Sequence, residues 1–146
     1  MKMTWLSMLA LSGLLMNCTQ RINMSNLPSV VQNSLKNHYP AATNPEWEKK
    51  GDHFEAEFDI QGQEHTVLID ASGQVLMRKQ DVATAELPQP VSGALQRDYQ
   101  AYLVDDVEKV EKNGQTYYQV ELENNNQDLK KVYALDGSVA DVPYWD

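Results

Sequence analysis

The sequence predicts an α+β protein made of two tandem repeats, each a helix followed by a four-stranded antiparallel meander. The first observation is a repeated segment, because LPSVVQNSLKNHY at residues 27–39 is echoed by LPQPVSGALQRDY at residues 87–99. Both copies open with Leu-Pro and place Val, Leu and Tyr at the same intervals. The second observation is that helical spacing of apolar residues gives way after each copy to alternation, which is typical of half-buried strands.

Each repeat is expected to begin with an amphipathic helix, the first over residues 28–39. The apolar residues of this helix recur at helical spacing on one face: Leu27, Val30, Val31, Leu35 and Tyr39. Pro28 suits a first helical turn, and Pro40 ends the helix because the residue before a proline is forced out of the α region. The second helix repeats the face with Leu87, Val91, Leu95 and Tyr99.

The meander of the first repeat begins with a short strand around Trp47 that ends at Gly51. The next strand alternates apolar and acidic residues: Phe54, Glu55, Ala56, Glu57, Phe58 and Asp59. A tight turn at residues 61–62 then pairs Phe58 with His65 and Phe54 with Ile69. A further turn at residues 70–73 leads into the fourth strand, which begins at Val75.

The second repeat follows the same plan with different residues. Its core-facing residues are expected to be Tyr118, Val120 and Leu122, followed by Tyr133 on the return strand. A last strand is predicted from Val139, and Pro143 places it at a sheet edge because proline cannot donate a ladder hydrogen bond. The repeats would span residues 27–82 and 87–146. Since a unit of this size buries little surface alone, we expect the two to extend one sheet and share a core.

The N-terminal residues 1–17 are typical of a secretion signal. Lys2 precedes an almost uncharged apolar run that is too short to span a bilayer. Cys18, the only cysteine, follows in LLMNC, which resembles a bacterial lipoprotein cleavage site, although Asn17 replaces the usual small residue. Lipidation of Cys18 is therefore predicted, with an ordinary cleaved signal as the alternative. Residues 18–26 are polar and would form a tether.

The composition narrows the classes of function. The chain carries 12 Lys and Arg against 21 Asp and Glu, a formal net charge of −9. An acidic chain repels nucleic acid and anionic membrane surfaces, so neither is an expected partner. No nucleophile elbow, phosphate-binding loop or paired metal-ligand spacing is present, so we expect neither an enzyme nor a cofactor. His53 and His65 would point to opposite sides of the sheet and could not share a metal.

Further residues carry a resemblance to a known family. The run from LP to YPAA, the tryptophan that follows, and the segment VLIDASGQVL at residues 67–76 resemble the PepSY-like family, which is related to β-lactamase-inhibitor proteins. The resemblance covers residues 27 to about 142. It is weaker in the second repeat, where no proline follows Tyr99 and Val107 replaces the tryptophan. It implies helices on one face of an antiparallel sheet, and a broad open face that grips a partner protein in the inhibitor relatives.

Strand phase predicts which residues form that open face. If the residues in phase with Phe54 and Tyr118 point toward the helices, their neighbours must point away. The predicted face consists of His53, Glu55, Glu57, Asp59, Leu68, Tyr117, Gln119, Glu121 and Val132. It is acidic in the first repeat and more aromatic and apolar in the second. Trp145 has no assigned phase, and it could serve recognition or close an edge of the core.

The resulting hypothesis is a non-catalytic lipoprotein, in the periplasm or anchored in the outer membrane of a Gram-negative bacterium. It would bind an envelope protein or peptide through the open face, and inhibition is one form this could take. Small-ligand or cation binding by Glu55, Glu57 and Asp59 is the alternative, and a purely structural envelope role is a third.

Overall fold

The computed structural model of the protein describes residues 20–146. The predicted signal segment and the lipidation of Cys18 lie outside the described residues. Within them, two ten-residue helices, two short 3-10 helices and eight strands follow one another along the chain. Their bounds are β1 (Gln20–Arg21), η1 (Met24–Asn26), α1 (Ser29–His38), β2 (Thr43–Lys50), β3 (His53–Ile60), β4 (Gln63–Asp70), β5 (Val75–Asp81), η2 (Thr84–Glu86), α2 (Gln89–Asp98), β6 (Leu103–Lys112), β7 (Gln115–Glu123) and β8 (Asp128–Ala134).

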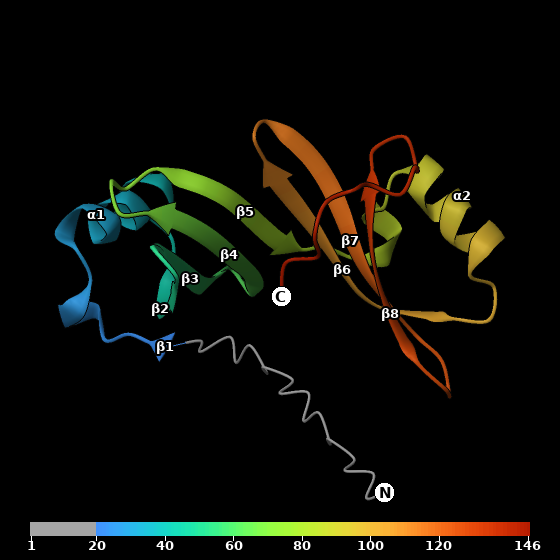
Figure 1. Cartoon of the computed structure of the whole chain (residues 1–146), viewed down its shortest axis with the longest axis horizontal. Helices are drawn as coiled ribbons and strands as arrows, with labels where there is room; N and C mark the ends of the chain where they lie inside the picture. The colour runs from blue at the N-terminus through green and yellow to red at the C-terminus, as the bar shows by residue number, and fades with distance from the viewer. Residues whose placement is uncertain (1–19) are drawn as a thin grey trace, which may run out of the picture.

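All eight strands belong to one sheet, in which every strand pairs antiparallel with its neighbour in the chain. Figure 1 shows α1 and α2 at opposite ends of the molecule, with β5 and β6 between them. The two halves are joined because Met77–Asp81 of β5 pairs with Glu108–Lys112 of β6. The helices are confirmed where the apolar spacing predicted them, and each ends just before the tyrosine of its repeated segment, Tyr39 or Tyr99.

The predicted fold class, two repeats of one helix plus a four-stranded meander, is wrong. The protein forms a single eight-stranded antiparallel meander with only two short α-helices. The expected last strand is reduced to an isolated bridge between Tyr133 and Val139, after which the chain leaves the sheet. At the opposite edge, Gln20 and Arg21 add the short strand β1, inside the segment predicted to be a tether.

The register of the central hairpin follows the turn prediction. In β3 and β4, Phe58 lies opposite His65 and Phe54 lies opposite Ile69, as a turn at residues 61–62 requires. Phe58 and His65 stack with their ring centroids 5.7 Å apart. The pleat therefore places the apolar residues of β3 against α1 and the acidic residues on the other side of the sheet.

The expected shared core does not form, because the buried apolar residues fall into two separate clusters. The first joins α1 to β2, β3 and β4: Leu27, Val31, Leu35, Trp47, Phe54, Ala56, Phe58, Val67 and Ile69. The second joins α2 to β6, β7 and β8: Leu87, Val91, Ala94, Leu95, Val107, Val120, Leu122 and Tyr133. Each helix covers only its own end of the sheet, so the seam between β5 and β6 has no helix over it (Figure 1).

Each helix is also held by a tight turn of the sheet. The turn between β4 and β5 reaches α1, where the Ser34 hydroxyl donates to the carbonyl oxygen of Gly73 at 2.7 Å. The turn after β8 reaches α2, and a Cβ added at Gly137 would lie 2.4 Å from the carbonyl oxygen of Pro90. Gly137 also has a φ of +82°, which only glycine adopts readily. Glycine there permits both the turn and the close approach to the helix.

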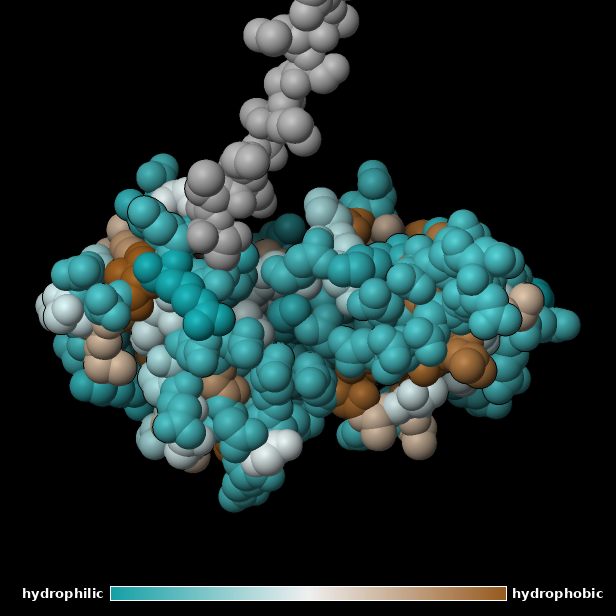
Figure 2. All heavy atoms as spheres, turned by 90° about the horizontal axis from the view of Figure 1, so that it is seen from below, coloured by the Kyte–Doolittle hydropathy of each residue, from teal (hydrophilic) through white to brown (hydrophobic). Residues whose placement is uncertain are grey.

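Within residues 20–146, no helix has the length and apolar character needed to cross a bilayer. Figure 2 shows the molecule from below the view of Figure 1, and this side is mostly hydrophilic with small, separated apolar patches.

Candidate binding face

The sheet face opposite the helices, here called the open face, carries all nine residues that strand phase assigned to it. His53, Glu55, Glu57 and Asp59 alternate with the buried residues of β3, and Leu68 lies opposite Glu55. On β7 and β8, Tyr117, Gln119 and Glu121 alternate with residues of the second cluster, and Val132 lies opposite Gln119. Their role in binding a partner stays a prediction.

The open face is not uniformly accessible. Glu57 is exposed, whereas Gln119 and Val132 are buried at 1% and 6% exposure. Thr66, Glu108 and Val110 are also buried, although strand pairing puts them on this same face. The other six predicted residues are half-buried: His53, Glu55, Asp59, Leu68, Tyr117 and Glu121. The helices lie on the other side of the sheet, so another part of the chain covers the middle of the open face.

That cover is the segment of residues 141–146, here called the closing segment. After β8 the chain turns at Gly137 and continues beside the strand, with the amide of Ala140 donating to the carbonyl of Val132 at 2.8 Å. Figure 1 shows the segment in red, running back from the α2 end of the molecule and ending between its two halves. Tyr144 and Trp145 are half-buried against the open face, whereas Asp146 is exposed.

The main chain of Trp145 is held by the side chain of Gln119. The Trp145 amide donates to Gln119 Oε1 at 3.1 Å, and Gln119 Nε2 donates to the Trp145 carbonyl at 2.9 Å. Lys79 Nζ donates to the same carbonyl at 3.1 Å. One buried amide side chain thus satisfies both backbone groups of a single residue, as a neighbouring β-strand would.

The indole of Trp145 reaches the other half of the molecule. Its Nε1 donates to Glu55 Oε2 at 2.8 Å, although these residues are 90 positions apart. The Lys79 ammonium lies 5.5 Å from the indole ring centroid, within the range of a cation–π interaction. Trp145 therefore contacts β3 and β5 through its side chain and β7 through its backbone, which ties the two halves together across the open face.

A buried ion pair lies under the closing segment. Lys79 Nζ is 2.6 Å from Glu108 Oε1, and both side chains are largely shielded from water, at 13% and 8% exposure. Gln119 Nε2 also donates to Glu108 Oε2. Buried charges are tolerated when they are paired and hydrogen-bonded, and Lys79, Glu108 and Gln119 satisfy one another in this way.

Tyr144 and Asp146, the neighbours of Trp145 in the chain, both contact Lys130. Lys130 Nζ lies 4.7 Å from the Tyr144 ring centroid and pairs with the Asp146 carboxylate. The Tyr144 hydroxyl is 3.5 Å from Glu108 Oε2. Burial raises the pKa of Tyr144, and the nearby carboxylate of Glu108 raises it further, because both disfavour the ionised phenol. Tyr144 is therefore neutral in this position at physiological pH.

The acidic residues of the open face do not form a metal site within the part of the chain that the structure describes. No group of three His, Cys, Asp or Glu side chains among residues 20–146 is placed to hold an ion. Glu55 instead pairs with Lys50 at 3.3 Å and accepts the indole of Trp145. Burial raises the pKa of Asp81, and Asp106 and Glu108 add to the shift, as expected where like charges gather.

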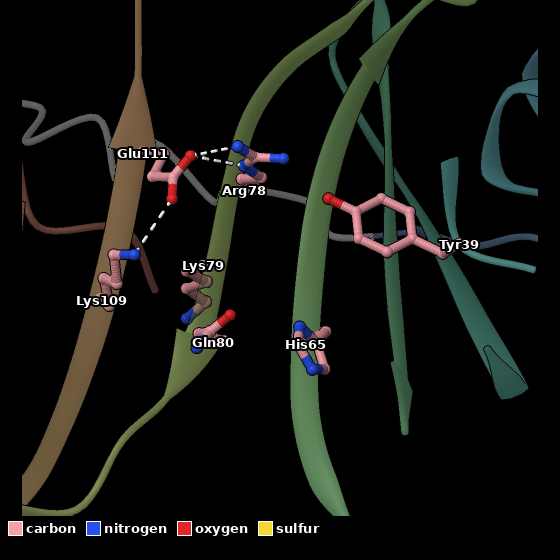
Figure 3. A pocket seen from close by; sticks show the side chains of 7 residues that line it. All are labelled: Tyr39, His65, Arg78, Lys79, Gln80, Lys109 and Glu111. Atoms are coloured by element: carbon pink, nitrogen blue, oxygen red, sulfur yellow. Dashed lines mark hydrogen bonds and ion pairs between the residues drawn. The ribbon is translucent and has the colours of Figure 1, made fainter. Parts of the chain in front are cut away.

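A polar pocket of about 260 Å³ opens near the seam between β5 and β6 (Figure 3). It is lined by Tyr39, His65, Arg78, Lys79, Gln80, Lys109 and Glu111. Glu111 Oε2 accepts Arg78 Nε at 2.7 Å, and its other oxygen lies 3.3 Å from Lys109. The hydrogen bond from Arg78 is the main reason that the pKa of Glu111 is lowered. Glu111 carries one negative charge against the two cations Arg78 and Lys109 that it contacts, so it offsets only part of the positive charge of this pocket.

Sequence reasoning missed Lys79, Glu108 and Lys130 as members of the site. Each lies in a strand whose existence was expected, but their partners are far away in the chain. The available signal was Trp145, a large apolar side chain without a place in the expected core. Its position beside Tyr144 and Asp146 could have indicated a segment that folds back onto the molecule.

The chain was compared with models of known protein families and with curated proteins. A family model described as "Putative beta-lactamase-inhibitor-like, PepSY-like" matches the chain twice, over residues 15–77 and 52–139. A comparison with the curated proteins finds no significant match.

Solved structures from Bacteroides species share the architecture. A DUF2874 family protein from Bacteroides uniformis is 26% identical with a TM-score of 0.72, covering 77% of this chain and 85% of its own. A BLIP-like protein from Bacteroides fragilis is 27% identical with a TM-score of 0.68, covering 82% of this chain and 92% of its own. A "putative periplasmic" protein from Bacteroides eggerthii, 22% identical with a TM-score of 0.73 over 77% of this chain and 85% of its own, shares the fold. Because the family model spans most of the sequence, the chain belongs to the PepSY-like, beta-lactamase-inhibitor-like family.

Proposed function

We propose that this protein is a non-catalytic binding module of the cell envelope, which grips a protein or peptide partner through the open face. The observation that carries the proposal is the way this face already holds Trp145. Gln119, Lys79 and Glu55 together bind the main chain and the indole of one aromatic residue. A surface that can desolvate and hydrogen-bond an aromatic side chain has the character of an interaction hot spot.

The charge distribution suggests how a partner would approach. In the first half, Glu57 is exposed on the open face beside the half-buried Asp59. In the second half, Tyr117 is half-buried, and its hydroxyl donates to Gln115 at 2.6 Å. A basic patch next to an apolar one would complement this surface, with charge steering the encounter and aromatic burial providing most of the affinity. The family description makes inhibition of an enzyme the form of binding to test first.

The test uses a partner recovered from envelope extract and then purified. Tyr117→Ala should weaken its binding by about 2 kcal/mol or more, the scale of an interface hot spot. Glu57→Lys, at an exposed position of the open face, should mainly slow association and flatten its salt dependence. Gln96→Ala, an exposed change on α2 at the opposite side of the sheet, is the matched control. Circular dichroism checks that each open-face variant is folded. If none of the folded variants changes the binding kinetics, the partner docks on another surface.

Envelope placement is part of the proposal and rests on the signal-like residues 1–17 and on Cys18. The Bacteroides eggerthii protein that shares the fold is named a "putative periplasmic" protein. The several acyl chains attached to a lipoprotein cysteine anchor it firmly in a membrane. If Cys18 is acylated, Cys18→Ser removes these chains and should release the protein into the soluble envelope fraction. A wild-type protein that is already soluble after fractionation would exclude the anchor.

A further inference from the structure

We propose that the surface beneath the closing segment is a recognition site for an extended peptide that carries a tryptophan followed by an acidic residue. The chain's own Trp145 and Asp146 fill this site in cis, so a partner segment of the same chemistry would compete with them. The inference rests on the proposed function, because it names the kind of partner that the open face accepts and what controls access to it.

The first support is that the site is built from buried polar groups. Gln119 is 1% exposed and Glu108 is 6% exposed, yet neither belongs to a hydrophobic cluster. Gln119 uses both ends of its amide on the backbone of residue 145, and Lys79 adds a donor to the same carbonyl. Backbone contacts of this kind accept any residue in an extended chain, as in strand addition to a sheet. They therefore provide affinity without requiring a particular side chain.

The second support is that the side-chain contacts favour tryptophan over other residues at this position. The Glu55 carboxylate accepts the indole N–H, which phenylalanine cannot offer. The Lys79 ammonium lies near the indole ring, and tryptophan is the aromatic residue that such a cation favours. One position further, Lys130 pairs with the Asp146 carboxylate. The site thus selects a tryptophan, and the largely exposed pair between Lys130 and Asp146 adds a weak preference for an acidic residue after it.

The third support is how little else holds the closing segment. Beyond the isolated bridge at Val139 the described chain contains no further strand or helix, and residues 141–146 are all exposed or half-buried. Segments with few buried apolar contacts open at low free-energy cost. A segment that is bound specifically but tethered loosely can be exchanged for one from another molecule. While the segment is in place, the apparent affinity of any competitor equals its intrinsic affinity multiplied by the fraction of open molecules.

The test measures binding of a fluorescently labelled peptide with the sequence of residues 141–146, DVPYWD, by anisotropy. The full-length protein is compared with its Trp145→Ala variant, in which the cis occupant is weakened. The peptide should bind the variant about tenfold or more tightly than the wild type, because the competing segment has lost its main contact. A peptide with alanine in place of its tryptophan should bind the variant about tenfold more weakly or worse.

Further changes in the Trp145→Ala background identify the site. Gln119→Ala should abolish peptide binding, whereas Gln96→Ala, an exposed glutamine on α2, should leave it unchanged. If Trp145→Ala does not fold by circular dichroism, Trp145→Phe replaces it, since that change keeps an aromatic ring and removes only the donor to Glu55. Equal affinity for wild type and variant, or binding that survives Gln119→Ala, overturns the proposal.

Two other outcomes would also overturn it. The first is no binding up to about 1 mM, the effective concentration that a short tether provides in cis. The second is a wild-type protein that dimerises by light scattering while Trp145→Ala stays monomeric, which would assign the site to the segment of a second copy. Failure of the peptide test leaves the proposed function standing if a purified envelope partner still responds to Tyr117→Ala. The reverse outcome is also distinct: the peptide binds as expected, but the open-face variants do not change binding of the purified partner. That result would support the peptide site and contradict the docking of the partner on the open face.

Discussion

Trp47→Ala should lower the free energy of unfolding by about 3–5 kcal/mol, the usual cost of removing a large aromatic side chain from a core. Trp47 is 4% exposed in β2 and belongs to the cluster that binds α1 to the sheet. No residue of the second cluster shares this packing, so the loss cannot be compensated from the other half of the molecule. Urea denaturation followed by far-ultraviolet circular dichroism measures the change.

Trp47→Phe is the matched control for this prediction. The indole N–H of Trp47 is buried and has no hydrogen-bond partner among the described residues. Phenylalanine removes that unsatisfied donor and keeps much of the apolar volume, so its cost should be clearly smaller than that of alanine. Equal losses from the two substitutions, or a loss below about 1 kcal/mol for Trp47→Ala, would contradict a packing role for Trp47 in this cluster.

Lys79→Met should cost about 3–5 kcal/mol, because it leaves the buried Glu108 carboxylate without its counter-charge. The ammonium and carboxylate are 2.6 Å apart and nearly excluded from water. Glu108→Leu should cost a comparable amount for the same reason. Combining the two changes should cost much less than their sum, since a buried ion pair can often be replaced by apolar residues of similar volume.

A double-mutant cycle in urea measures this coupling directly. The exposed pair between Arg97 and Asp98 on α2 provides the control, and Arg97→Ala should change stability by no more than about 0.5 kcal/mol. Additive losses from Lys79→Met and Glu108→Leu would show that the two charges do not depend on each other. In that case Lys79 and Glu108 would each be satisfied by other groups, and the closing segment would only shield them from water.

Local patterns in the sequence were sufficient for the helices and for the sidedness of the strands. The spacing of Val31 and Leu35 and of Val91 and Leu95 located α1 and α2, because a helix places such positions on one face. Alternation around Phe54 and Tyr118 placed nine residues on the open face, because the pleat leaves only two sides to choose from. The turn at residues 61–62 then set the pairing of β3 with β4.

Tertiary structure alone decided that the apolar residues form two clusters and that the closing segment lies on the open face. Nothing local in residues 138–146 distinguishes a last edge strand from a segment that crosses the sheet. The outcome depends on partners far along the chain, since Trp145 meets Glu55 over 90 positions and Lys79 over 66. Periodicity reports which side of an element is buried, whereas the choice of a distant partner depends on which groups the folded chain brings within hydrogen-bonding range.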